Sequence, residues 1–188
     1  MLTKFETILK STGFEQICVS DKEVSNFIKN MKNQDHCILI FQDEQNRDKI
    51  VKQFFNPKHT RNYMTACFSN TPSKYECNHQ MSYKTLIQEQ KFQPHLVTDF
   101  LLSVLADSYK KDQTRIACEE TSWLAEHGMF DDHQKWANSL DEKVIAESAI
   151  MCCYNASKMD EHQMKTIIAS RKFVILDDPL SVYSIKDS

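Results

Sequence analysis

The sequence has 188 residues, of which 41% are hydrophobic and 26% charged, and its formal net charge is −3. These values are ordinary for one soluble globular domain, and the small net charge gives no general attraction to nucleic acid or acidic membranes. No run approaches the ~20 apolar residues that cross a bilayer, and the first residues lack the apolar core of a signal peptide. We therefore expect a single cytoplasmic domain over residues 1–188, with neither nucleic acid nor membrane as a partner.

Glycine usage restricts the possible functions most. Only Gly13 and Gly128 occur, whereas average usage would give about thirteen. The Walker A loop, the Rossmann fingerprint and the kinase Gly-rich loop all need glycines, because these let backbone N–H groups approach phosphates closely. The sequence therefore contains none of these three phosphate-binding motifs.

The cysteines are odd in number and form no CxxC pair. Five of them lie in apolar runs typical of strands, and reduced buried cysteines behave as small hydrophobes. We expect core packing in a reducing compartment. The seven are Cys18, Cys37, Cys67, Cys77, Cys118, Cys152 and Cys153.

The N-terminal part, residues 1–34, predicts a helical extension packed on the core. Apolar residues recur at helical spacing in residues 2–9, and Gly13 follows as a C-terminal stop. Residues 14–19 can form a short strand. A capping box of Ser20 with Glu23 opens the next helix.

Strands and helices alternate through the rest of the chain. We expect strands at 36–41, 62–69, 114–118, 148–154 and 172–176, with a last short strand at 182–185. We expect helices over 44–55, from Pro94 to 105, from Asp131 or Asp132 to 140, and from Ser157 or Asp160 onward, while 75–92 reads as a short strand or a loose segment. This alternation predicts an α/β domain of three layers, with a mostly parallel sheet and helices on both faces.

Three segments in a fixed order carry a resemblance to a known family. Residues 36–55 (HCILIFQDEQNRDKIVKQFF) give a His, an apolar strand, an acidic loop and a helix. Residues 115–128 (RIACEETSWLAEHG) give a strand that ends in Glu and runs into a Ser-Trp turn. Residues 149–176 (AIMCCYNASKMDEHQMKTIIASRKFVIL) give a strand ending in Cys-x-Tyr-Asp, with Asn155 for the Asp, then a helix and a last strand. In this order they resemble the MEDS domain, the sensory domain of a dichloromethane-metabolism regulator and its relatives in methanogens and methylotrophs. The sequence departs from the family where Glu119 replaces a glycine and where ASRK replaces a His.

The resemblance implies a fold like that of the RecA and KaiC ATPases with a degenerate P-loop, in a stand-alone member of archaeal type. It implies a sensory domain without catalysis or cofactor, binding a small molecule such as a simple hydrocarbon derivative. A stand-alone sensor passes its state to another chain, so the expected partner is a histidine kinase or a transcription regulator.

Candidate ligand-binding residues follow the strands, because ligands of open α/β sheets bind at the carboxyl ends of the strands. Gln42 and Asp43 begin an acidic loop that would repel phosphates, and Asp43 or Glu44 is alternatively a helix N-cap. Glu120 could hydrogen-bond a ligand or the backbone of the next turn. Trp123 could form the wall of an apolar pocket or only pack against the core.

Cys153 and Tyr154 end a further strand. Alternation places Cys152 and Tyr154 on one face and Cys153 on the other. A functional thiol at Cys153 near Glu120 is one interpretation, and simple packing is the other.

His36 matches a histidine of the family, and a ring that titrates near neutrality would suit ligand binding or proton sensing. The alternative is a hydrogen bond to a nearby carbonyl. Because His36 precedes its strand, it should lie at the end of the sheet opposite Glu120. His127 and His133 match no zinc spacing, so we expect no metal site.

Three hypotheses of function remain. The first is a non-catalytic sensory domain that binds a small molecule and signals through a partner protein. The second is a protein–protein interaction or homodimerisation module, with the helix at 94–110 or the terminal helix as the contact element. The third is a residual nucleotide-binding RecA-like protein, which only the expected fold supports.

Overall fold

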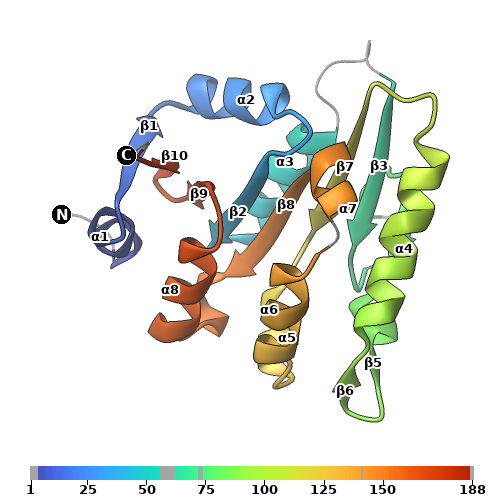
Figure 1. Cartoon of the computed structure of the whole chain (residues 1–188). Helices are drawn as coiled ribbons and strands as arrows, with labels where there is room; N and C mark the ends of the chain where they lie inside the picture. The colour runs from blue at the N-terminus through green and yellow to red at the C-terminus, as the bar shows by residue number, and fades with distance from the viewer. Residues whose placement is uncertain (1–3, 56–61, 72–73, 141, 187–188) are drawn as a thin grey trace.

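The computed structural model describes residues 4–55, 62–71, 74–140 and 142–186 (Figure 1). Within these residues, eight strands form one sheet in the order β1-β10-β9-β2-β8-β7-β3-β4. The short strands β5 (Ile87–Gln88) and β6 (Lys91–Phe92) form a separate hairpin. The strands of the large sheet are β1 (Phe14–Cys18), β2 (His36–Phe41), β3 (Tyr63–Phe68), β4 (His79–Met81), β7 (Gln113–Cys118), β8 (Ser148–Asn155), β9 (Phe173–Asp177) and β10 (Leu180–Ile185).

Six neighbouring strands of this sheet, from β9 to β4, run parallel. β10 is antiparallel to β9 because only a tight turn joins the two strands, and β1 is antiparallel to β10. The segment 1–34 therefore adds an edge strand to the sheet as well as two helices, although residues 1–3 lie outside the described part.

Helices cover both faces of the sheet and complete the three layers (Figure 1). α2 and α3 bury their apolar residues on one face, and the remaining α-helices bury theirs on the other. This arrangement confirms the expected three-layer α/β fold with a mostly parallel sheet. The α-helices are α1 (Lys4–Ser11), α2 (Asp21–Asn30), α3 (Glu44–Phe55), α4 (Pro94–Asp107), α5 (Ser122–Glu126), α6 (Phe130–Asn138), α7 (Glu142–Glu147) and α8 (Glu161–Ala169).

Local signals predicted several helix ends correctly. The capping box of Ser20 with Glu23 begins α2, and Asp160 with Gln163 forms a second one at α8. The expected cap of α6 is wrong, because the helix begins at Phe130 after Met129 without a side-chain cap bond. Asp131 and Asp132 instead occupy its first turn, where carboxylates interact favourably with the helix dipole.

A buried arginine in β7 ties two helices to the sheet. The Arg115 side chain is fully buried. Its Nη1 donates to the carbonyls of Phe54 (2.6 Å) and Ile28 (3.2 Å), and its Nη2 donates to those of Lys29 (3.1 Å) and Met31 (3.0 Å). One guanidinium thus satisfies the last carbonyls of both α2 and α3, groups that have no partner within their own helices. No helix of the described residues is both long and apolar enough to span a membrane.

Candidate functional site

The turn between β2 and α3 presents backbone N–H groups that could bind an anion, and a carboxylate of the chain itself accepts them. Asp177, the last residue of β9, is buried. It accepts the backbone N–H of Gln42 at 3.0 and 3.1 Å and that of Asp43 at 3.0 Å. N–H groups at the start of a helix bind anions readily. Here Asp177 already satisfies them.

A set of charged side chains fills the space next to this turn, and we call it the strand-end cluster. It consists of Arg47, Asp48, Lys74, Glu119 and Glu120. The Arg47 Nη2 lies 3.0 Å from Asp48 Oδ1 and 3.3 Å from Glu119 Oε1, and its Nη1 lies 3.6 Å from Glu120 Oε2. Lys74 Nζ lies 2.8 Å from Glu119 and 3.1 Å from Asp48.

Arg47 is the centre of the strand-end cluster and is almost fully buried, at 1% exposure. Burial alone would lower the pKa of its guanidinium, but the carboxylates of Glu119 and Asp48 outweigh burial and raise it. Arg47 is therefore a permanent cation in this space. An anion at the β2–α3 turn would compete with Asp177, and a cation at Glu119 and Asp48 would compete with Arg47 and Lys74.

Glu120 was predicted to contact a ligand or the following turn, and it makes ion pairs instead. Lys158 donates to its Oε1, and Lys158 also lies 2.9 Å from Glu126. The Glu120 backbone N–H donates to the Tyr83 hydroxyl at 3.3 Å. The side chain is thus held between Arg47 and Lys158 and is not directed at an open pocket.

The other predicted residues of this end do not share one crevice. Trp123 packs against the core beside Tyr83, and its ring lies 3.9 Å from that of His127. Cys153 is fully buried on the face covered by α3, and burial raises the pKa of its thiol. Tyr154 is buried on the opposite face, where burial raises the pKa of its hydroxyl. The side chains of Gln42 and Asp43 are exposed, and Asp43 accepts the N–H of Gln45 at 2.8 Å, as an N-cap does.

His36 lies at the amino end of β2, at the end of the sheet opposite the strand-end cluster. Its Nε2 is buried and has no hydrogen-bond partner within the described residues. Burial is the main cause that lowers the pKa of its ring to about 3, and the charge of Arg171 lowers it further. His36 is therefore neutral near pH 7, which contradicts the expectation that it titrates near neutrality.

A small cavity lies next to His36, between the sheet and the helices α4 and α6. We call it the α6 cavity, and its volume is about 30 Å³. Strand register places His36, Ile150 and Ile116 in one row across β2, β8 and β7, and Cys152 and Cys118 in the next row. The apolar lining residues are Phe68, Leu101, Ile116, Trp136, Ala137, Leu140 and Ile150, and the others are His36, Cys118, His133, Cys152 and Arg171.

Two further features set the chemistry of the α6 cavity. His133 is buried, and burial together with the Arg171 charge lowers the pKa of its ring to about 4. A hydrogen bond from the Cys118 thiol lowers the pKa of Cys152, and the same bond raises that of Cys118. Among the described residues, no group of three or more His, Cys, Asp or Glu side chains is arranged to hold a metal ion.

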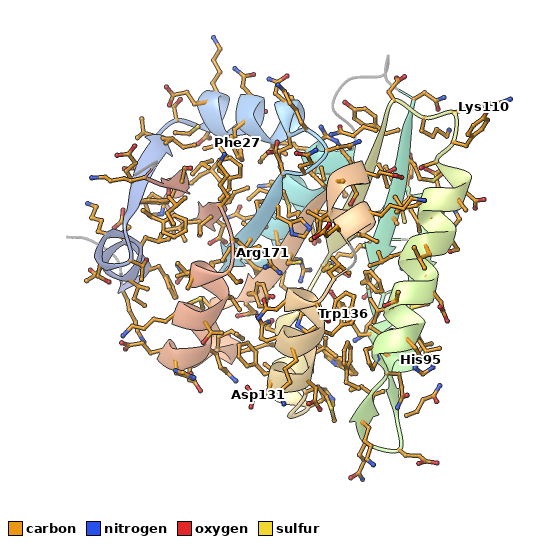
Figure 2. All side chains as sticks on the ribbon, in the orientation of Figure 1. Phe27, His95, Lys110, Asp131, Trp136 and Arg171 are labelled. Atoms are coloured by element: carbon orange, nitrogen blue, oxygen red, sulfur yellow. The ribbon has the colours of Figure 1, made fainter. Side chains whose placement is uncertain are left out.

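Sequence reasoning placed only His36 at this cavity as a ligand-binding residue. Arg171 and Trp136 carried no motif, and His133 was considered only for metal binding. Only the three-dimensional structure shows that these residues are neighbours, because α6, the loop before β9 and the start of β2 meet on one face of the sheet (Figure 2).

By sequence, the chain matches no protein-family model and no curated protein. It is similar in structure to a Pyrococcus horikoshii OT3 protein solved as Project ID PH0250, with a TM-score of 0.54 and 7% identity, over 87% of this chain and 93% of that one. It is also similar to EssC (ATPases 2 and 3) from Geobacillus thermodenitrificans, with a TM-score of 0.46 and 10% identity over 91% of this chain. The cytoplasmic domain of EssC gives a TM-score of 0.44 and 11% identity over 77% of this chain.

The chain spans only 36% and 31% of the two EssC chains. The Pyrococcus structure, matched over nearly its full length, shows a shared fold at an identity too low to transfer function.

Proposed function

We propose that this chain is a non-catalytic regulatory domain that binds one small, largely apolar molecule in the α6 cavity and signals through a partner protein. The observation that carries the proposal is the small, mostly apolar cavity with His36 Nε2 beside it, a nitrogen that has no hydrogen-bond partner within the described residues. The resemblance to the MEDS domain supports a role of this chain in sensing a hydrocarbon derivative.

The unpartnered nitrogen is the reason to expect an occupant. A buried polar group without a hydrogen bond costs roughly 1–3 kcal/mol. A ligand that supplies the missing partner recovers this cost when it binds, while the apolar walls favour its hydrocarbon part. The site thus offers both an orienting contact and an apolar surface.

The strand-end cluster supports a non-catalytic role. Asp177 occupies the anion position, and Arg47 is paired with Glu119 and Asp48. A nucleotide would compete with contacts that the folded chain already makes. This geometry favours a binding domain over an ATPase.

Helix α4 connects the cavity to the outer surface on which a partner could bind. Leu101 of α4 lines the cavity, and the next residue, Leu102, is 40% exposed. Tyr109, just after α4, is 86% exposed. A ligand that shifts α4 would change this outer surface, where we place the partner's contact.

A thermal-shift screen with small organic molecules tests the proposal. A ligand that binds only the folded chain raises the melting temperature. Ala137→Leu adds volume at the cavity wall and should abolish the shifts, whereas Ala106→Leu, at an exposed position of α4, should retain them. If no molecule shifts the wild type, or if both variants retain every shift, the proposed site is wrong.

A further inference from the structure

Two polar residues of the α6 cavity, His36 and Arg171, lie near the edge of the cavity formed by β2 and the loop before β9. His36 begins β2, and Arg171 lies in the loop just before β9, the strand next to β2. Figure 2 shows Arg171 beside β2, whereas Trp136 lies between α6 and α4. The Trp136 Nε1 donates to Thr98 of α4 at 3.2 Å, so its polar atom is already satisfied. His36 and Arg171 therefore form the part of the lining at which a charged group could be bound.

Arg171 brings a positive charge that the described residues do not balance. Its Nη1 donates to the Ser170 carbonyl at 2.8 Å. Within the described ranges, no carboxylate lies within 4.0 Å of its guanidinium. This contrasts with Arg47, which carboxylates surround. A half-buried guanidinium without an acid is suited to a ligand that carries the acid.

The neighbouring imidazoles strengthen this assignment. His36 and His133 both lie close enough to Arg171 for its charge to disfavour their protonation, and both are neutral near pH 7. The Gln134 side-chain amide lies 3.3 Å from His133 Nδ1 and can donate to it, which would put the ring proton on Nε2. Neutral imidazole N–H groups are donors to an anion.

We propose, on the basis of the proposed function above, that the ligand of the α6 cavity is a small organic acid. Its carboxylate pairs with Arg171 and meets His36, and its short apolar body lies among Trp136, Leu140 and Ile150. A volume of about 30 Å³ has room for about two water molecules, so half-buried lining side chains such as Trp136 and Arg171 must move to admit even a short acid. A wholly apolar ligand would leave both the guanidinium and the imidazole nitrogen without a partner.

Propionate and butyrate are the probes, and propionamide and 1-propanol are the neutral molecules of similar shape. Titration calorimetry and thermal shift on the full chain, with sodium chloride at matched ionic strength, should show saturable binding of the carboxylates. The neutral molecules should bind at least about tenfold more weakly, since a hydrogen bond between charged groups adds at least that factor. Arg171→Gln should remove this preference, while Lys172→Gln, its exposed neighbour, should retain it.

Each outcome decides between the two proposals. If the neutral molecules bind as tightly as the acids and Arg171→Gln has no effect, the proposal of an organic acid is wrong, while the proposal of a small-molecule site is retained. Inorganic phosphate that binds as well as propionate would show a general anion site and also overturn it. If none of the four probes binds the wild type, the proposal of an organic acid is wrong. If no molecule of a broader library binds either, the proposed function is wrong too. The comparison on the wild type does not depend on any variant being folded.

Discussion

The carboxylate of Asp177 accepts the backbone N–H of Gln42 at 3.0 and 3.1 Å, across 135 positions of sequence. This contact joins the end of β9 to the turn that follows β2. Helix starts of this kind commonly hold phosphate groups. In this chain, the anion is part of the protein, and the turn has a structural role.

Removal of this carboxylate should destabilise the fold. We expect Asp177→Asn to lower the free energy of unfolding by about 1–2 kcal/mol, because an amide cannot replace all the charge-assisted bonds to the N–H groups of Gln42 and Asp43. Urea unfolding measures the loss. Asp178→Asn, at the exposed neighbouring position, serves as the control and should change stability little. Equal stability of the two variants would show that the contact contributes nothing.

Arg47 should be essential for stability. Arg47→Met removes one of the two cations that pair with buried Glu119 and leaves only Lys74, and breaking a buried pair in this way costs up to about 3–5 kcal/mol. Lys49→Met, on the exposed side of the same helix, should cost far less. Chemical denaturation checks both variants.

The double variant Arg47→Met with Glu119→Gln should recover part of the loss, since neither charge is then left alone. Purely additive losses in this double-mutant cycle would contradict a direct interaction between Arg47 and Glu119.

Nucleotides should not bind to the wild type. We expect MgATP and MgADP at millimolar concentration to leave the melting temperature unchanged, because Asp177 already binds the N–H groups of the turn before α3 and Arg47 is paired with Asp48 and Glu119. Differential scanning fluorimetry is sufficient for this test. A saturable rise in melting temperature that Glu119→Gln abolishes would instead support the nucleotide-binding alternative.

Stability should fall as the solution becomes acidic. The ordinary pKa of histidine is 6.5, and that of His36 in the folded chain is about 3. Above pH 6.5 both states hold a neutral ring, so this residue adds no pH dependence there. Between pH 6.5 and about 3 the unfolded state binds the proton first, and the free energy of unfolding decreases, by up to about 2 kcal/mol at pH 5.

His36→Gln should reduce the slope of this profile, measured by urea unfolding between pH 7.5 and pH 5. Buried His133, whose pKa is also lowered, to about 4, should maintain part of the slope. The control is His162→Gln, at an exposed position of α8, which should keep the wild-type slope. The same slope in all three proteins would show that His36 does not resist protonation.

The large elements could be predicted from the sequence because their apolar patterns are local. The run at 36–41 gives β2, and the capping box of Ser20 with Glu23 gives the start of α2. α5 and α7 escaped prediction because helices of five and six residues hold too little periodic pattern. Arg115 gave no signal either, because its partners are carbonyls at the ends of two distant helices.

The candidate site was less predictable for the same reason. Glu120 follows β7, and Cys153 lies near the end of the neighbouring strand β8. Ion pairs with Arg47 and Lys158 hold the Glu120 side chain, whereas the Cys153 side chain is buried in the core beneath α3. The proposed role of Arg171 in binding an acid depends on the absence of a carboxylate within 4.0 Å among the described residues. This absence is a property of three-dimensional packing. His36 could be found because its position before β2 is a local feature.

The most direct test of the central claim is imidazole NMR of the ¹⁵N-labelled chain during a titration with propionate. The account predicts that the ring signals of His36 shift saturably while those of exposed His162 stay in place, and that Ala137→Leu removes the shift. His36 signals that stay unchanged while propionate raises the melting temperature would place the binding site elsewhere and contradict the α6 cavity as the site.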